Sequence, residues 1–510
     1  MEKPINYLKI GKATDLTGSD ARLYRYFEIL PGFLSWVTLI GLFALSYFLP
    51  IWVAYFIIAF DIYWLLLVVY LGIHLVASYR KMQKNVKINR KQKCEELPGW
   101  QDVYHLIILP TVNESLEVII PTFQSLIDDG YPTDKMIVVL AIEERAGPSA
   151  IDRAETIKNK FGNMFNHFLI TSHPAFIESE LKGKGANQAW AAKKVKEEII
   201  DKYDYNYDNI LASVFDIDTI VIPGYFHCLT ATFLTVENPH RASYQPIPVY
   251  HNNIWQAPFF ARVAASSNTF WQMMQQIRQE KLATYSSHSM TWRALSDVGF
   301  WSTNMVSEDS RIFWHCFCHY NGDYRVEPLN FPVSMDVTMD RSIWQTMKSL
   351  YFQQRRWGWG VENVPYLMFN FVKNFDKAPK KKFYGRIFVQ LYGFHSWATN
   401  AIIIAAIGWM PVLLGGNKFN ATVLSTNLPV VTRTLMTFAM VGLVVSAIIS
   451  TLLLPKRPPN YSFGKNISMV LQWLILPVSI IVFGAIPGIE AQTRLMLGKY
   501  MGFRVTPKMR

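Results

Sequence analysis

Charged residues are scarce in this sequence, and it has no internal repeat or low-complexity tract. Asp, Glu, Lys and Arg make up 17% of the 510 residues, whereas 51% are hydrophobic and 15% aromatic. This balance argues against an ordinary soluble protein of the same length, which carries more charge. The apolar residues are concentrated in separate runs, which indicates membrane segments and not simply a larger core.

Five long apolar runs lie toward the two ends of the chain. Their ranges are 31–50, 51–78, 393–416, 434–455 and 467–488. The first two reach the ~20 residues needed to cross a bilayer core, and the second contains Asp61 as its only formal charge. Because 30 polar and charged residues precede the first run, no cleavable signal is apparent and both runs are expected to be retained.

Basic residues flank the block that lies between the two groups of apolar runs. They are Lys84, Lys87, Arg90, Lys91 and Lys93 on one side, and Lys377, Lys380, Lys381 and Lys382 on the other. By the positive-inside rule, both flanks lie in the cytoplasm. Attraction of these clusters to anionic membrane lipid accounts for the net charge of +12. A nucleic-acid partner is not expected, because the charge lies beside apolar runs and not on a separate face.

These features predict a multi-pass protein of the cytoplasmic membrane. We expect a cytoplasmic segment at 1–30, two transmembrane helices at 31–79, a cytoplasmic domain with interfacial C-terminal helices at 80–383, three or four transmembrane helices at 384–490, and a basic tail at 491–510. The four cysteines fall in the cytoplasmic domain, where disulfides are not expected. No sequence feature specifies an oligomeric state.

The side of the tail stays open at this point. Three C-terminal crossings would leave the tail outside, yet Arg494, Lys499, Arg504, Lys508 and Arg510 favour the inside. Either one apolar run is re-entrant, or a further crossing lies around 384–395.

The central block alternates short apolar runs with helical patterns, which predicts an α/β domain with a largely parallel sheet. Strands are expected at 103–110, 135–142 and 209–215, and a helix at 114–129. Glu143 and Glu144 follow the second strand, and Asp216-Ile217-Asp218 follows the third. In open α/β sheets the ligand crevice lies at the carboxyl ends of the strands, so these acids are candidates for a site.

The D-x-D pair is the first candidate for chemistry. In an extended segment Asp216 and Asp218 face the same way, so their carboxylates converge. Paired carboxylates beside a crevice suit a divalent cation that also binds a substrate diphosphate. The alternative is two solvated acids at a strand end, and a single D-x-D occurs often by chance.

The stretch LKGKGANQAWAAKKV at 181–195 is a second candidate. Gly183 and Gly185 allow the backbone to bend closely around a ligand, and Lys182 and Lys184 could meet phosphate charge. The alternative is a loop before a helix, with solvated lysines.

The stretch VSEDSRIFWHCFCHY at 306–320 is a third candidate. Glu308 and Asp309 open a helical pattern, where acids either stabilise the helix dipole or provide a general base for a hydroxyl. His315 and His319 are spaced like zinc ligands, but two further ligands are not evident, so a zinc site is not favoured.

The order of the motifs is more specific than any one of them. P-x-x-N-E from Pro110 to Glu114, the acids at 143–144, GKGANQA, D-x-D, E-D and QQRRW at 353–357 together resemble a membrane-embedded family 2 glycosyltransferase. The GT-A-fold synthases of cellulose, chitin and hyaluronan belong to this family, as does ceramide glucosyltransferase. The resemblance covers about residues 100–360 and the flanking apolar runs, and QQRRW matches the Q-x-x-R-W element at each defined position.

The resemblance implies a role for individual residues. Asp216 and Asp218 would hold Mg²⁺ or Mn²⁺, and Asp309, next to Glu308, would be the base for an inverting displacement. A nucleotide-sugar, with a UDP-sugar favoured, would be the donor. The donor-side positions are Pro110, Asn113, Glu114, Glu143, Glu144, Lys184 and Asp216. Glu143-Glu144-Arg145-Ala146 departs from the family's D-D-G-S at the nucleoside end.

The QQRRW motif at 353–357 would complete the acceptor and diphosphate end of the site. It places Gln353, Arg356 and Trp357 on an interfacial helix, whereas Tyr351, Phe352 and Trp359 are ordinary aromatic anchors for a membrane interface. We therefore expect Arg356→Ala to abolish sugar transfer and Trp359→Phe to be much milder.

Three functions fit these features. Processive synthesis of a polysaccharide is favoured over addition of one sugar to a lipid acceptor, because the Q-x-x-R-W element leans that way. A transporter or scaffold is the third function, since the intramembrane Asp61 could mark an ion path. The low span count, the lack of an inverted repeat and the large soluble block argue against it.

Overall fold

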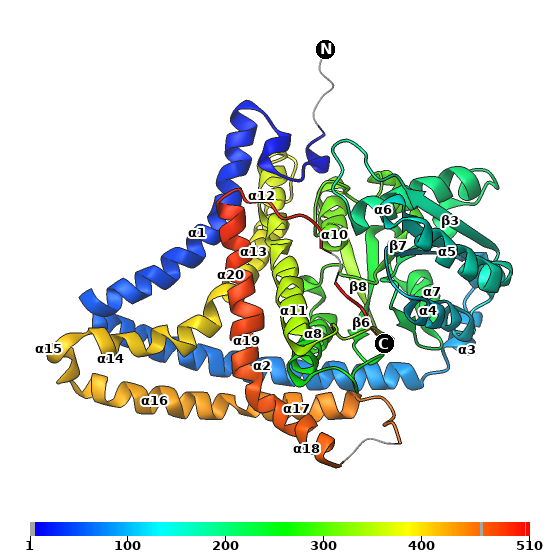
Figure 1. The fold of residues 1–510 in the computed structure, drawn as a ribbon. Helices are drawn as coiled ribbons and strands as arrows, with labels where there is room; N and C mark the ends of the chain where they lie inside the picture. Colours follow the sequence, from blue (N-terminus) through cyan, green and yellow to red (C-terminus); the bar gives the residue numbers. More distant parts are fainter. Residues whose placement is uncertain (1–5, 460–462, 505, 510) are drawn as a thin grey trace.

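The computed structural model describes residues 6–459, 463–504 and 506–509, so Arg510 lies outside the described residues. Long helices extend from one side of a domain built on a β-sheet (Figure 1). The first two are α1 (Gly18–Phe48) and α2 (Pro50–Lys87). α1 begins before the first predicted span and ends within it, whereas α2 continues past the end of the second. The chain is therefore divided into a sheet domain and a set of apolar helices.

The sheet domain contains one eight-stranded mixed sheet within the described residues. The strand order is β3-β2-β1-β4-β7-β6-β8-β5. In sequence order the strands are β1 (Tyr104–Pro110), β2 (Met136–Glu143), β3 (His167–His173), β4 (Ile210–Val214), β5 (Ile220–Val221), β6 (Ala242–Val249), β7 (Ser289–Thr291) and β8 (Arg325–Ser334). The strands expected at 103–110, 135–142 and 209–215 are confirmed as β1, β2 and β4.

The sheet is less parallel than the sequence predicts. Strands β3, β2, β1 and β4 are parallel, as are β6 and β8. The pairings β4–β7, β6–β7 and β5–β8 are antiparallel. The short strands β5 and β7 carry little hydrophobic pattern, so the sequence does not reveal this half of the sheet.

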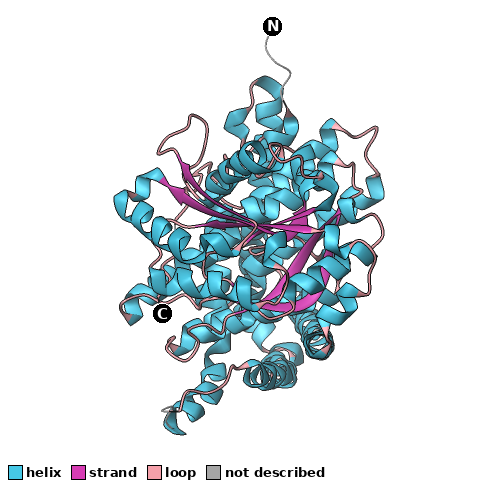
Figure 2. Ribbon diagram, turned by 90° about the vertical axis from the view of Figure 1, so that its right-hand side faces the viewer, coloured by secondary structure: helices cyan, strands magenta, loops and turns pink. Residues whose placement is uncertain are grey.

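Helices cover both faces of the sheet (Figure 2). One face packs against α4 (Leu116–Asp128), α5 (Pro148–Phe161) and α7 (Tyr225–Thr235), and the other against α6 (Lys184–Val195), α10 (Glu308–His319) and α12 (Asn363–Lys373). Because β1 and β2 are buried on both faces, their sequences are nearly continuous apolar runs and not alternating ones.

Within the part of the chain that the structure describes, four helical segments are long and apolar enough to cross a membrane: Gly18–Phe48, Pro50–Lys87, Val423–Leu453 and Ile467–Met496. A fifth candidate is the pair Lys380–Ala405 and Ile407–Leu414, which is bent by 43°. The elements of these C-terminal segments are α13 (Lys380–Ala405), α14 (Met410–Leu414), α15 (Gly416–Asn420), α16 (Val423–Ala439), α17 (Val441–Leu453), α18 (Phe463–Leu471), α19 (Leu476–Ile480) and α20 (Ile486–Met496).

The remaining α-helices of the described chain are α3 (Arg90–Glu95), α8 (Phe259–Ile277), α9 (Trp292–Asp297) and α11 (Ile343–Gly358). Of these, α8 packs against α2 and α11 packs against α20, whereas α9 packs against β4 and β7 in the sheet domain. In Figure 1, α11 and α20 run steeply across the direction of α2, between the sheet domain and the other apolar helices. Tyr351 and Arg355 of α11 both bind Glu490 of α20, each at 2.6 Å.

Both ends of the described chain pack against the sheet domain. Near the N-terminus, the Ile10 carbonyl accepts a hydrogen bond from Arg311 at 2.9 Å. At the other end, the Met509 carbonyl accepts one from Asn253 at 2.9 Å, and Figure 1 shows this C-terminal segment ending beside β6 and β8. The two ends and the sheet domain therefore lie on one side of the apolar helices.

Candidate active site

The D-x-D motif lies just beyond the carboxyl end of β4. Thr219 donates its backbone N–H to the Asp216 carbonyl at 2.8 Å, so the segment is a turn and not the extended stretch that the sequence argument assumed. The two carboxylates still converge, because Lys508 forms an ion pair with Asp218 and lies 4.0 Å from Asp216 Oδ2. Asp218 is buried, and its Oδ2 accepts the Asp336 backbone N–H at 3.0 Å.

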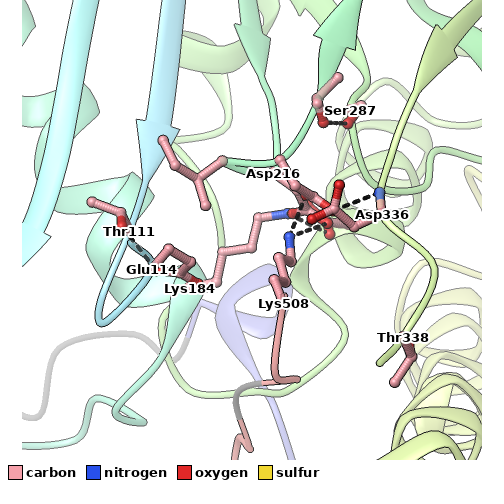
Figure 3. Close-up of polar contacts among 12 residues, drawn as sticks. Thr111, Glu114, Lys184, Asp216, Ser287, Asp336, Thr338 and Lys508 are labelled. Atoms are coloured by element: carbon pink, nitrogen blue, oxygen red, sulfur yellow. Dashed lines mark hydrogen bonds and ion pairs between the residues drawn. The ribbon is translucent and has the colours of Figure 1, made fainter. Parts of the chain in front are cut away.

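Lys184 joins the D-x-D motif to the E-D motif, and Figure 3 shows its side chain reaching Asp216. Its ammonium lies 2.7 Å from Asp216 Oδ1 and 2.8 Å from Asp309 Oδ2. Burial disfavours the charged form of this lysine, but the carboxylates of Asp216 and Asp309 together raise its pKa above the ordinary value. Lys182, the other candidate of this stretch, is exposed. One of the two predicted lysines therefore enters the site.

The glycines around Lys184 permit close approaches to other segments. A Cβ at Gly185 would lie 2.9 Å from the Ser302 carbonyl oxygen, and one at Gly183 would lie 2.6 Å from the Phe503 ring. The first approach lets α6 begin against the segment that precedes α10. The sequence predicted that Gly183 and Gly185 let the backbone bend around a ligand. In this structure they let protein segments approach each other closely.

The C-terminal segment crosses the site. Besides the ion pair of Lys508, the Arg356 guanidinium lies over the Phe503 ring at 4.9 Å from its centroid. Although burial raises the pKa of Asp216, the ammonium groups of Lys184 and Lys508 outweigh it and hold this pKa well below its usual range. Lys508 is thus a positive charge placed between the two D-x-D carboxylates.

Adjacent carboxyl groups at the start of α10 have different environments. Glu308 is buried, and burial together with the Asp309 charge raises the pKa of Glu308 to about 8, although Lys184 and Arg356 oppose this. Asp309 is partly exposed and bound to Lys184 through both oxygens, at 3.1 and 2.8 Å. Burial and the Asp309 charge therefore favour the protonated form of Glu308, beside an ion-paired Asp309.

The QQRRW stretch forms the end of α11. Gln353 Oε1 accepts a hydrogen bond from Thr338 at 2.8 Å, and the electrostatic effect of Arg356 on Glu308 places this arginine near the E-D motif. Trp357 and Gln353 line a small cavity together with Tyr250. The last motif therefore lies near the E-D motif in space, although about 45 residues separate them in sequence.

Trp359 does not fit the predicted role of a membrane-interface anchor. Only 1% of its surface is exposed, and its Nε1 donates a hydrogen bond to Glu362 Oε2 at 2.8 Å. The sequence argument relied on its position beside an apolar run, whereas the chain turns at Trp359–Glu362 and carries this ring into the protein.

The remaining donor-side candidates lie at the carboxyl ends of two strands, β1 and β2. Pro110 ends β1, Asn113 is exposed, and Glu114 Oε2 accepts hydrogen bonds from Thr111 and the Val112 N–H, each at 2.8 Å. Glu114 also contributes to the raised pKa of Lys508, which burial opposes. At the end of β2, Glu143 forms an ion pair with Arg145, and Glu144 accepts the Ala175 N–H at 2.8 Å.

Two residues of the site were missed by sequence reasoning. Asp336 lies two residues beyond β8. Its backbone N–H donates a hydrogen bond to Asp218 Oδ2, and its Oδ1 accepts one from Asn252 at 2.8 Å. It follows the end of a strand, which is the signal that could have found it. Lys508 was assigned to a basic tail, and no local pattern connects it to the D-x-D motif.

The zinc spacing of His315 and His319 has no counterpart in the structure. Within the described part of the chain, no three His, Cys, Asp or Glu side chains are arranged to hold a metal ion together. Burial lowers the pKa of His315 to about 3, so this ring is neutral in the core.

No protein-family model and no curated protein sequence matches the chain. Among solved structures, it is similar to a mannosyltransferase from Pyrobaculum calidifontis in complex with GDP-Man and Mn²⁺, with 14% identity, a TM-score of 0.40, and coverage of 75% of this chain and 99% of that one. It is also similar to S. aureus TarS 1–349, with 11% identity, a TM-score of 0.36, and coverage of 69% and 91%. These values are too low to transfer a ligand or an activity to this chain.

Proposed function

We propose that this chain is a glycosyltransferase that moves a sugar from a nucleotide-sugar to an acceptor hydroxyl at a membrane, with inversion at the anomeric carbon. The observation that carries the proposal is the ion-pair cluster in which Lys184 lies 2.7 Å from Asp216 and 2.8 Å from Asp309. A candidate diphosphate site and a candidate base are thus one side chain apart. The order of the sequence motifs supports the same activity independently.

Asp309 is the general base of this proposal. Asp309 is ion-paired with Lys184, whereas burial raises the pKa of its neighbour Glu308 to about 8. Two adjacent carboxyl groups in different environments can take different roles. Asp309 would accept the proton of the acceptor hydroxyl as that oxygen attacks the anomeric carbon. Arg356 and Lys184 would supply positive charge to the departing diphosphate.

The D-x-D residues fit a divalent cation. The Lys508 ammonium lies between Asp216 and Asp218 and acts as a stand-in cation in this structure. Carboxylate oxygens suit Mg²⁺ or Mn²⁺. Asp216 and Asp218 would hold the ion, which when bound would neutralise charge on the donor diphosphate. A UDP-sugar is the favoured donor, on the resemblance of the sequence motifs.

For the acceptor we favour a growing polysaccharide. Trp357 lines a cavity together with Tyr250 and Gln353, and aromatic side chains beside polar ones are suited to stack on and hydrogen-bond a sugar. A lipid acceptor that receives one sugar is the alternative, and the apolar helices beside the site suit such an acceptor. A transporter is disfavoured, because the charged cluster lies in the sheet domain and not among the apolar helices.

The contacts of the two chain ends support a membrane arrangement. With both ends and the sheet domain on one side, the helices before and after the domain would each cross an even number of times. We infer that α1 and α2 form one pair of crossings, and that α13–α14 and α16–α17 form another. The segment Ile467–Met496 would then lie along the membrane surface, which agrees with its breaks into α18, α19 and α20. The sheet domain would face the cytoplasm, as its basic flanks favour.

The decisive experiment is incorporation of labelled sugar by the purified full-length protein in nanodiscs. UDP- and GDP-sugars would be tested in turn with Mn²⁺, and the products separated by size and by extraction into organic solvent. Long polymer supports the synthase, and a one-sugar extractable product supports the lipid acceptor. No chelator-sensitive incorporation from any donor would overturn the enzyme proposal. Asp216→Ala and Asp309→Asn should each abolish incorporation, whereas a transporter would keep its activity in both.

A further inference from the structure

Glu362 connects two parts of the candidate active site and belongs to none of the sequence motifs. It lies just after the QQRRW stretch, in the short turn Trp359–Glu362 between α11 and α12. Its Oε1 accepts hydrogen bonds from the Ser307 N–H at 3.0 Å and the Ser307 hydroxyl at 2.7 Å. Its Oε2 accepts the Trp359 Nε1–H at 2.8 Å. One buried carboxylate therefore binds the residue before Glu308 and the segment after Trp357.

These contacts are not ordinary helix capping. Ser307 is at the N-cap position of α10, where a serine hydroxyl usually accepts a backbone N–H of the first turn. Here the Ser307 side chain makes no capping hydrogen bond and donates to Glu362 instead. The bond therefore fixes the direction of α10 relative to α11, and it does so next to Glu308 and Asp309.

A second set of contacts holds the same junction. Arg311, one turn into α10, donates to the Glu362 carbonyl at 3.2 Å and to Asn363 Oδ1 at 2.6 Å. Asn363 in turn donates to the Ser310 hydroxyl at 2.9 Å. The start of α10 is thus bound to the α11–α12 junction through both backbone and side chains. Arg311 is 1% exposed and Glu362 7% exposed, so water does not compete strongly for these bonds.

We propose that Glu362 is a positioning residue for sugar transfer, which holds the base-bearing end of α10 in register with the arginine and tryptophan of the QQRRW motif. This inference rests on the proposed function. Glu362 touches neither Asp309 nor Arg356 in the contacts given above, so it acts through Ser307 and Trp359. A small change in the placement of a base can lower a rate by about a hundredfold without weakening substrate binding.

The test uses Glu362→Gln in the full-length protein in nanodiscs. The amide keeps the size of the side chain, but its NH₂ must face either the Trp359 N–H or the Ser307 donors, so one side of the bridge is lost. We expect kcat to fall by about a hundredfold, while the Kd for the nucleotide-sugar, measured by calorimetry, changes less than about threefold. A purely structural role would instead lower the unfolding temperature and leave kcat per folded molecule unchanged.

Asp129→Asn is the matched control. Asp129 is also a buried carboxylate that accepts backbone N–H groups, from Tyr225 at 2.7 Å and Phe226 at 3.3 Å. It follows α4 and binds the start of α7, away from the α10–α11 junction. This variant should lose stability and keep its kcat. If Glu362→Gln does not fold, Trp359→Phe removes only one bond of the bridge and should still lower kcat by about tenfold at unchanged donor Kd.

The outcomes separate the two proposals. If the wild-type protein transfers no sugar from any donor, the proposed function fails. If the wild type is active and Glu362→Gln or Trp359→Phe keeps the full kcat, the positioning role of Glu362 is overturned and the proposed function stands. A parallel loss of kcat in Asp129→Asn would also overturn it, because the effect would then follow general destabilisation.

Discussion

The ammonium of Lys508 forms an ion pair with the carboxylate of Asp218, 290 residues away in sequence. The same ammonium lies 4.0 Å from Asp216, so it occupies the position between the D-x-D carboxylates that a divalent cation would take. A lysine and a metal ion cannot both fill this position. If the site binds the proposed cation, the C-terminal segment would therefore compete with it.

Removal of the Lys508 charge should make the cation easier to bind. In Lys508→Ala, the Mn²⁺ concentration for half-maximal sugar transfer should fall by about tenfold, the change expected when competition worth ~1.4 kcal/mol is lost. Lys499→Ala, in the same segment but exposed, is the control and should behave like the wild type. An unchanged Mn²⁺ requirement in Lys508→Ala would show that the ion pair does not persist in the working enzyme.

Glu308 should make stability depend on pH. Its pKa is raised to about 8 by burial and by Asp309, above the ordinary value of 4.5. The folded protein therefore holds this proton more tightly than the unfolded chain, and the stability from it is lost as pH rises toward 8. Glu308→Gln has no such proton to lose. The difference between its unfolding temperature and that of the wild type should therefore increase from pH 5 to pH 8.5. A constant difference over that range would mean that Glu308 is ionised throughout.

The two arginines of QQRRW should differ sharply. Arg356→Ala should lower kcat by about a hundredfold or more, the size seen when a group that stabilises transition-state charge is removed. Arg355→Ala is the control, because Arg355 binds Glu490 of α20 at 2.6 Å. It should lower the unfolding temperature with a much smaller effect on kcat. Radiolabel transfer per inserted molecule measures both, and equal losses would mean that the stretch acts only as an anchor.

The proposed membrane arrangement predicts where single cysteines are labelled. Lys456→Cys and Lys499→Cys flank Ile467–Met496, and both should react from the side of the sheet domain. Lys418→Cys, in α15, should react from the other side. The four natural cysteines are buried and can be kept. Labelling of Lys456→Cys and Lys499→Cys from opposite sides would show that Ile467–Met496 crosses the membrane.

Local sequence determined the elements that depend on nearby residues. The strands β1, β2 and β4 were predictable because strands buried on both faces need continuous apolar runs. The place of the acids after β4 was predictable because a strand end fixes where the next residues lie, although the extended geometry assumed for them was wrong. Motif order singled out Lys184, Glu308, Asp309 and Arg356 as candidates, although it said nothing about their distances.

Trp359 shows where local reasoning fails. Aromatic residues beside an apolar run usually mark a membrane interface, and on that basis Trp359→Phe was expected to be mild. The structure buries the ring and binds it to Glu362, so we now expect that variant to lower kcat. Position along the chain could not reveal this, because the burial depends on how α11, α12 and α20 pack together.

The sequence by itself determined a membrane-associated α/β chain with two carboxylate motifs, because hydrophobic periodicity and motif order are properties of neighbouring residues. Only the tertiary structure decided that Lys184 joins those motifs, that Glu362 holds α10 against α11, and that Lys508 lies on Asp218. Each of these contacts joins segments from 55 to 290 residues apart, and charged side chains at such separations meet only when the sheet and its helices have packed.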